Sequence, residues 1–284
     1  MKKRNKIEEN VFRVLMFVST ILISIVLLLI LYGILHKGLW VLSWEMLTSV
    51  PKGGYYFGHE GGIANAIVGS VYLSFGAVIL AIIIGLPVAL FINIHVVQYQ
   101  RFVHAVRFLL DLLWGVPSIV YGAFGFMLMI WLGLKSSLLA GIITVALFII
   151  PIIIRGIDEV LKTVPRGLLE SSLSLGANRT EVGYKIMVRQ CMPGIVTALL
   201  LSFGRAIGDA AAVLFTAGFT DRIPTGLMQP TATLPLSIFF QLSSPIEEVK
   251  ARAYAAAVLL TFIVLIISLL SRYFSHKFKK NSIK

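Results

Sequence analysis

Long apolar runs alternate with shorter polar segments along this chain. Six of the runs have about the 20 residues that a helix needs to cross the hydrocarbon core of a bilayer. They cover roughly residues 14–35, 67–95, 108–131, 138–154, 194–219 and 253–270. Pro151, near the end of the short fourth run, predicts a kink or an early exit. Neighbouring helices can satisfy the carbonyls that Pro87 and Pro117 free inside the second and third runs, so we predict six transmembrane helices.

The composition agrees with an all-α membrane protein. Hydrophobic residues make up 58% and charged residues 13% of the chain, and the mean hydropathy is +0.91. A soluble domain is closer to half apolar and a quarter charged. The first apolar run is longer than the core of a signal peptide and no small-x-small cleavage site follows it, so we expect a retained helix. The single Cys191 cannot form an internal disulfide and is expected to pack as a small apolar residue.

Lysine and arginine residues are distributed unevenly between the two sides of the predicted membrane protein. With the N-terminus inside, the inner segments hold 18 of these residues and the outer segments hold 6, while Arg205 falls within a run. Because cytoplasmic loops carry excess Lys and Arg, both termini are predicted to be cytoplasmic. The net charge of +12 mostly reflects this asymmetry, so we expect contact with the lipid bilayer, for example through residues 277–280, and no nucleic-acid partner.

The two outer segments lack the features of a catalytic or metal site. Residues 36–66 combine aromatic residues with glycines and predict an interfacial helix followed by a Gly-rich turn. His36 and His59 have no companions at metal-ligand spacing, so no metal site is expected. In the segment 220–250, the apolar stretch 234–242 is too short to cross the membrane and predicts a re-entrant or interfacial piece.

The inner segment 156–192 is too long for a simple turn and is rich in helix formers and basic residues. It predicts two short helices that separate near Gly176, with Pro165 at the start of the first and Asn178 or Thr180 capping the second. Its composition alone indicates only a basic inner loop that follows the positive-inside rule and contacts lipid headgroups.

The spacing of three residues within this segment is more specific. Glu170, Gly176 and Ile186 lie at the offsets of a pattern that reads Glu-Ala-Ala, three residues, Gly, nine residues, Ile-x-Leu-Pro. The segment resembles the cytoplasmic coupling loop of the permease subunits of bacterial ABC importers, in which a helix docks into the ATP-hydrolysing subunit. Serines replace both alanines of the pattern, and Arg189 stands where the proline is usual. The resemblance implies coupling roles for Glu170, Ser171, Ser172, Gly176, Ala177 and Ile186.

Two pairs of opposite charges within or at the edge of the third and fifth apolar runs are spaced four residues apart, so that each pair lies on one helix face. Arg107 and Asp111, at the membrane edge, are expected to pair for a structural purpose. Arg205 and Asp209 fall inside the fifth run, where a charge costs about 2.5–3.5 kcal/mol. Either this pair locks helix packing, or it lines a substrate path in which the guanidinium donates two parallel hydrogen bonds to an oxyanion.

Three stretches resemble the phosphate-type permeases of this family more closely. Residues 205–217 follow the pattern Arg-x-x-Gly-Glu-Thr-Ala-Pro-Leu-Leu-Phe-Thr-Ala, with Asp209 in place of Glu and Ala212 in place of Pro among the differences. Residues 228–239 follow Met-Gln-Pro-x-Ala-x-Leu-Pro-x-x-Ile-Phe, and residues 115–122 read Gly-Val-Pro-Ser-Ile-Val-Tyr-Gly. This last stretch is expected to allow close helix packing through Gly115, Pro117 and Gly122.

The resemblance covers about residues 65–275 and implies the six-helix fold of a type I ABC importer permease. This core would follow a cytoplasmic tail, first helix and outer loop at 1–64 and precede a basic cytoplasmic tail at 276–284. The chain would form half of a phosphate path in the bacterial cell membrane. Its implied partners are a homologous permease subunit, an ATP-binding subunit and an extracytoplasmic phosphate-binding protein.

No enzyme constellation is apparent in the sequence. It contains no Gly-x-x-x-x-Gly-Lys-Ser/Thr phosphate loop, so the chain is not expected to hydrolyse ATP, to hold a cofactor or to carry catalytic residues. One alternative is a permease for another oxyanion, such as molybdate, tungstate or sulfate. A second alternative is an intramembrane enzyme or scaffold, which would have a polar catalytic pair in a span and no docking loop.

Overall fold

The computed structural model describes residues 2–51 and 61–279, and the regular secondary structure within these ranges is helical. The longer helices are α1 (Lys2–Gly38), α3 (Ala64–Leu90), α4 (Gln100–Gly115), α5 (Ser118–Trp131), α6 (Leu138–Leu161), α9 (Val188–Gly208) and α11 (Glu247–Lys279). The shorter ones are α2 (Trp44–Thr48), α7 (Arg166–Ser174), α8 (Arg179–Glu181) and α10 (Leu234–Leu242). Two π-helical segments, η1 (Phe91–His95) and η2 (Val182–Met187), continue α3 and precede α9.

Five helical stretches in the described part of the chain are long and apolar enough to cross a membrane. They are α1, α3 with η1, α6, the run from α8 to α9, and α11. Helices α4 and α5 meet this condition only as a pair and are bent by 95° relative to each other. The six predicted spans are therefore reached when the bent pair is counted as one broken span.

The third predicted span is broken because of Pro117. Val116 has an extended backbone (φ −69°, ψ 129°), as the residue before a proline prefers, and it ends α4. Pro117 then stands at the N-cap of α5. The expectation that this proline lies inside a continuous helix is wrong, whereas Pro87 does lie inside α3.

Two other helix boundaries differ from the prediction. Helix α6 contains Pro151 and continues to Leu161, so the predicted early exit of the fourth span is wrong. Helix α9 ends at Gly208, and residues 209–219 form turns and irregular backbone in place of the last part of the fifth span. That stretch is as apolar as a helix interior, which is why hydropathy did not reveal the boundary.

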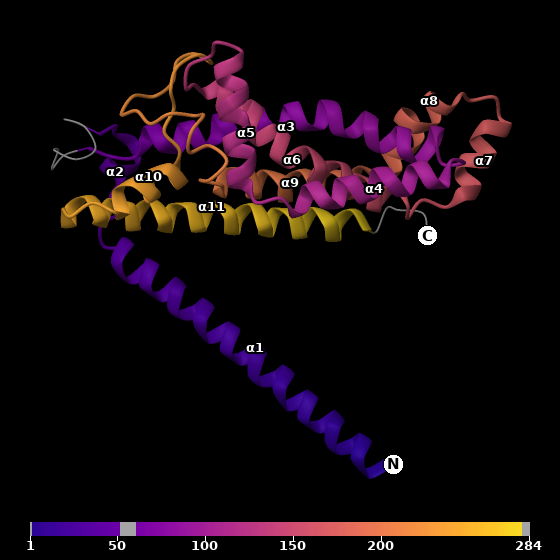
Figure 1. The fold of residues 1–284 in the computed structure, drawn as a ribbon, viewed down its shortest axis with the longest axis horizontal. Coiled ribbons are helices and arrows are strands. Elements are labelled where there is room, and N and C mark those ends of the chain that lie inside the picture. Colours follow the sequence, from indigo (N-terminus) through magenta and orange to yellow (C-terminus); the bar gives the residue numbers. More distant parts are fainter. Residues whose placement is uncertain (1, 52–60, 280–284) are drawn as a thin grey trace.

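Helix α6 lies at the centre of the bundle, against α3, α4, α5 and α9. Small residues bring these helices together: an added Cβ at Gly85 would lie 3.1 Å from Ile153, and one at Gly156 would lie 3.0 Å from Ala198. Cys191 is buried in the same core, as predicted. Helix α1, in contrast, extends away from the bundle with an apolar surface that is unburied along its span (Figure 1).

The short helices lie at the two ends of the long axis of the bundle (Figure 1). Helices α7 and α8 lie at one end, together with the C-terminal end of α11, and the N-terminal end of α1 points the same way. Helices α2 and α10 lie at the opposite end. The predicted short helix within 36–66 is confirmed by α2, and the stretch 234–242, expected to be too short to cross the membrane, forms α10. His59 and most of the predicted Gly-rich turn fall in 52–60, outside the described residues.

Candidate functional site

The segment between α6 and α9 contains the two short helices that the sequence predicts. Pro165 precedes α7, and Asn178 caps α8 with its side chain accepting from the backbone N–H of Glu181 at 2.8 Å. The Glu181 carboxylate accepts from the Asn178 N–H in return, which completes a capping box. Asn178, and not Thr180, is therefore the cap.

Gly176 ends α7 in a conformation that favours glycine. Its φ is +89°, its N–H donates to the Leu173 carbonyl at 3.0 Å, and the Ala177 N–H donates to the Ser172 carbonyl at 3.2 Å. These two bonds form a Schellman motif, whose left-handed residue is strained for any side chain with a Cβ. The glycine in the sequence pattern is thus explained by the backbone turn between α7 and α8.

The residues that match the coupling pattern divide into an exposed set and an inward set. Glu170, Ser171 and Gly176 are exposed, whereas Ser172 is buried and Ala177 and Ile186 pack against the core. Sequence reasoning missed Leu175, which is 89% exposed at the tip of the segment. This apolar side chain is therefore accessible at the tip of the segment, beside the Gly176 turn.

Two contacts fix this segment to the end of α3. Arg179 donates from Nη1 to the carbonyls of Ile94 at 3.0 Å and His95 at 3.3 Å, at the C-terminal end of η1. Gly183 faces the Ile94 side chain so closely that an added Cβ would lie 2.9 Å from it. These contacts join α8 and η2 to η1, which continues α3.

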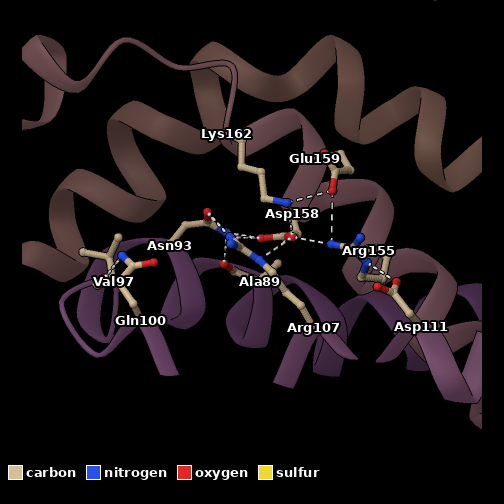
Figure 2. Close-up of polar contacts among 10 residues, drawn as sticks. All are labelled: Ala89, Asn93, Val97, Gln100, Arg107, Asp111, Arg155, Asp158, Glu159 and Lys162. Atoms are coloured by element: carbon tan, nitrogen blue, oxygen red, sulfur yellow. Dashed lines mark hydrogen bonds and ion pairs between the residues drawn. The ribbon is translucent and has the colours of Figure 1, made fainter. Parts of the chain in front are cut away.

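The buried carboxylate of Asp158 links three helical elements, η1, α4 and α6, where the segment between α6 and α9 begins (Figure 2). Asp158, near the end of α6, has a fully buried side chain. Arg107 from α4 donates to both its oxygens, with Nη2 to Oδ1 at 2.9 Å and Nε to Oδ2 at 3.0 Å. Arg155 Nη1 lies 2.7 Å and Lys162 Nζ 3.1 Å from Oδ2. Asn93 from η1 donates to Oδ1 at 2.8 Å.

Asp158 therefore connects η1, α4 and α6 at the point where the coupling segment leaves the membrane bundle. Two exposed carboxylates complete the network, because Arg155 also contacts Asp111 at 2.6 Å and Glu159 at 3.1 Å. A cavity of about 530 Å³ adjoins it, lined by residues that include Asn93, Arg107, Lys162 and Glu170. The C-terminal end of α6, from which residues 162–165 lead into α7, is thus held by charge-assisted hydrogen bonds, which are shorter and stronger than neutral ones.

The predicted pair of Arg107 and Asp111 is wrong. Arg107 binds Asp158 and Asp111 binds Arg155, because α4 packs along α6 and both residues face that helix. The sequence did contain a signal for this network. Arg155, Asp158, Glu159 and Lys162 are spaced three and four residues apart, as on one charged helix face, but the prediction assigned them to a loop.

Arg205 lies at the middle depth of the bundle. Its guanidinium carbon is 4.8 Å from the centroid of the Phe148 ring, and Phe148 is the eleventh of 24 residues in α6, about 15 Å from the start of that helix. The Arg205 side chain is exposed on the surface of this chain, while Phe148 is buried beneath it. Arg205 therefore lies about halfway along α6, far from both ends of that helix.

Arg205 and Asp209 do not form an ion pair, although both belong to the described residues. Asp209 stands at the C-cap of α9 with an extended backbone, and its Oδ1 accepts from the N–H of Ala212 at 2.8 Å. The expected pairing on one helix face is wrong, because the helix ends between the two residues. Asp209 instead fixes the turn that follows α9.

Residues 115–122 contain the break between α4 and α5 and contact the turn that follows α9. An added Cβ at Gly122 would lie 2.6 Å from the carbonyl oxygen of Ala211, so this glycine allows α5 to contact the turn after α9. The Tyr121 hydroxyl donates to the Leu113 carbonyl at 3.0 Å, across the break between α4 and α5. Gly122 is confirmed as a packing site, whereas an added Cβ at Gly115 would meet no described atom within 4 Å. Pro117 acts by breaking the helix.

Comparison with known proteins gives the family. The chain matches the model of the binding-protein-dependent transport system inner membrane component over residues 81–280. It belongs to this family. Among its relatives, it is 33% identical to the phosphate transport system permease protein PstA of Haemophilus influenzae, over 93% of this chain and 92% of that protein. It is 32% identical to the protein of the same name from Pasteurella multocida, over 86% of each chain.

Solved structures confirm the fold class of a type I ABC importer permease. A chain of the MetNI methionine ABC transporter in an inward-facing conformation superposes with a TM-score of 0.62 at 19% sequence identity, covering 76% of this chain and 95% of that chain. As a member of the binding-protein-dependent family, the protein is a multi-pass inner membrane component with a role in transport. No group of three or more metal-binding side chains occurs within the described ranges.

Proposed function

We propose that this chain is a membrane-spanning permease subunit of an ATP-driven phosphate importer, in which it forms half of the translocation path. The observation that carries the proposal is its similarity, along almost the whole chain, to permeases named for phosphate transport. The contacts around α7 and Arg205 are what such a role needs, namely a rigid contact with a motor and a cation at the depth of a path.

ATP hydrolysis is assigned to a separate subunit that binds α7. The sequence has no phosphate-binding loop of its own. Glu170 of α7 and Leu175 at its C-cap are exposed. Arg179 joins the following helix α8 to η1, and the Asp158 network holds the end of α6 that precedes α7 against η1 and α4. A rigid attachment is required because closure of the ATPase must move helices that lie tens of ångströms away.

Arg205 is assigned to the phosphate path. An exposed guanidinium at mid-membrane depth costs about 2.5–3.5 kcal/mol if it faces lipid, so its surface faces water or a companion subunit. Its planar fork and permanent charge suit an oxyanion. Contact with the Phe148 ring orients the guanidinium and contributes about 0.5–2 kcal/mol without using its N–H donors. A homologous permease subunit would supply the other wall of the path.

The charge distribution sets the orientation of the subunit. The α7 end carries most of the Lys and Arg residues of the loops and is assigned to the cytoplasm, together with both termini. The end with α2 and α10 would then face the extracytoplasmic phosphate-binding protein. This arrangement places the motor and the substrate donor at opposite ends of the bundle.

The test is substrate-resolved uptake by the reconstituted importer. The chain, a companion permease and the ATPase are placed in liposomes with the phosphate-binding protein outside and ATP inside. We expect uptake of labelled phosphate that requires ATP and this chain, and little uptake of sulfate or molybdate. Preferential uptake of either of those anions, or equal phosphate uptake without this chain, would contradict the proposal.

A further inference from the structure

A polar groove lies between α9 and α11, apart from the Arg205 and Asp158 sites. It has a volume of about 440 Å³ and is lined by Thr197, Leu201, Ser268, Ser271, Arg272, Ser275 and His276. The five residues from α11 follow the spacing of one helix face, at offsets of three, four, seven and eight positions. This face carries three hydroxyls, a guanidinium and an imidazole, and the lining contains no carboxylate.

Most polar side chains of this face have no side-chain hydrogen bond or ion pair with other described residues. No side-chain hydrogen bond or ion pair there involves Arg272, Ser268, Ser271 or Ser275. Hydroxyls inside helices of this protein commonly bond back to the preceding turn, as Thr261 of the same helix does to the Ala257 carbonyl at 2.7 Å. The serines of the groove therefore offer donors to a ligand.

The groove lies where an apolar surface ends. Leu201, Leu265 and Leu269 are each at least half exposed on the membrane side of it, and the exposed Tyr273 ring follows at the position expected of an interfacial aromatic residue. Helix α11 has 33 residues and a length of roughly 50 Å, so it extends beyond a hydrocarbon core of about 30 Å. The groove is near its C-terminal end, at the same end of the bundle as α7 (Figure 1).

We propose that this groove binds the headgroup phosphate of an anionic phospholipid. The Arg272 guanidinium would donate two parallel hydrogen bonds to the non-bridging oxygens, and the serine hydroxyls and His276 would donate to the remaining lone pairs. The acyl chains would lie along Leu265 and Leu269 of α11. An apolar strip that ends in a cationic, donor-rich groove complements both halves of an anionic lipid, and basic pockets between helices on the cytoplasmic side bind such headgroups.

The lipid would bridge α9 and α11. Helix α9 connects the coupling segment to Arg205, so a headgroup held between these helices would stabilise the part of the bundle through which coupling is transmitted. The site itself does not depend on the identity of the transported anion. Failure to transport phosphate would leave the lipid proposal standing, and loss of lipid binding would leave the transport proposal standing.

The experiment measures lipid retention by the complete purified complex in detergent. Phosphatidylglycerol, phosphatidylcholine or inorganic phosphate is titrated, and bound lipid is counted by native mass spectrometry. We expect R272Q to weaken phosphatidylglycerol binding about tenfold or more, R272K to weaken it less, and phosphatidylcholine to bind weakly throughout. R101Q is the matched control, because it removes an exposed arginine of α4 outside the groove.

A second variant keeps the proposal testable if R272Q fails to fold. The double change S268A and S275A preserves charge and nearly preserves volume, and it is expected to weaken phosphatidylglycerol binding in a complex that still assembles. Equal lipid retention by the R101Q and R272Q complexes would overturn the proposal. So would displacement of the lipid by millimolar inorganic phosphate, which would identify an ion site, or protection of R272C from labelling by the companion permease, which would identify a subunit interface.

Discussion

Replacement of Asp158 by alanine is expected to destabilise the protein strongly and to uncouple it. The Asp158 side chain is fully buried and receives contacts from Asn93, Arg107, Arg155 and Lys162. Its removal leaves three cations near one another with only the exposed carboxylates of the network as partners. Breaking a buried ion pair on one side costs about 3–5 kcal/mol, and we expect D158A to fall in this range. D158N, which keeps the shape and some of the hydrogen bonds, should lose less.

Glu159 provides a matched control on the same helix. It contacts Arg155 and Lys162 as Asp158 does, but its side chain is 58% exposed. Exposed ion pairs contribute about 0–1 kcal/mol, so E159A should be nearly neutral. The assay compares thermal unfolding of the purified complex and the ratio of phosphate transported to ATP hydrolysed. Equal unfolding temperatures and equal ratios of phosphate transported to ATP hydrolysed in D158A and E159A would contradict the claim that the Asp158 network holds η1, α4 and α6 together.

Three further changes test other parts of the structure. G176A places a Cβ on a residue with φ +89° and should cost on the order of 1–2 kcal/mol, seen as weaker copurification of the ATPase; normal copurification would contradict this. G122V pushes against the Ala211 carbonyl and should reduce phosphate uptake at normal membrane expression, which a G115V control should not do. R205A should abolish uptake, and D209A added to it should not restore uptake because the two residues do not pair; restored uptake would return Arg205 to a structural role.

The local features of this fold could be predicted from the sequence. Apolar run length located the membrane helices, because the bilayer sets the length of every span. Asn178, one of two candidate caps, predicted a helix start, and Gly176 predicted a helix end, because both effects act through the neighbouring backbone. The coupling segment was therefore found with its two helices in the right places.

The long-range contacts could not be predicted in the same way. Arg107 had an acid one helical turn away in the sequence, yet it binds Asp158 because α4 packs on α6. The end of α9 at Gly208 was missed because residues 210–217 are as apolar as a helix interior. Asp209 was the available signal, since an Asp side chain that accepts from a following N–H favours a turn over a helix.

The central claim is that α7 is the contact through which an ATPase drives this permease. Site-specific cross-linking from residue 175 tests it most directly, because Leu175 is 89% exposed and Cys191, the one native cysteine, is buried. L175C is joined to single-cysteine variants of the ATPase subunit in the assembled complex, with the exposed K135C at the opposite end of the bundle as control. We predict a cross-link from L175C only. No cross-link from L175C, or an equal one from K135C, would contradict the claim.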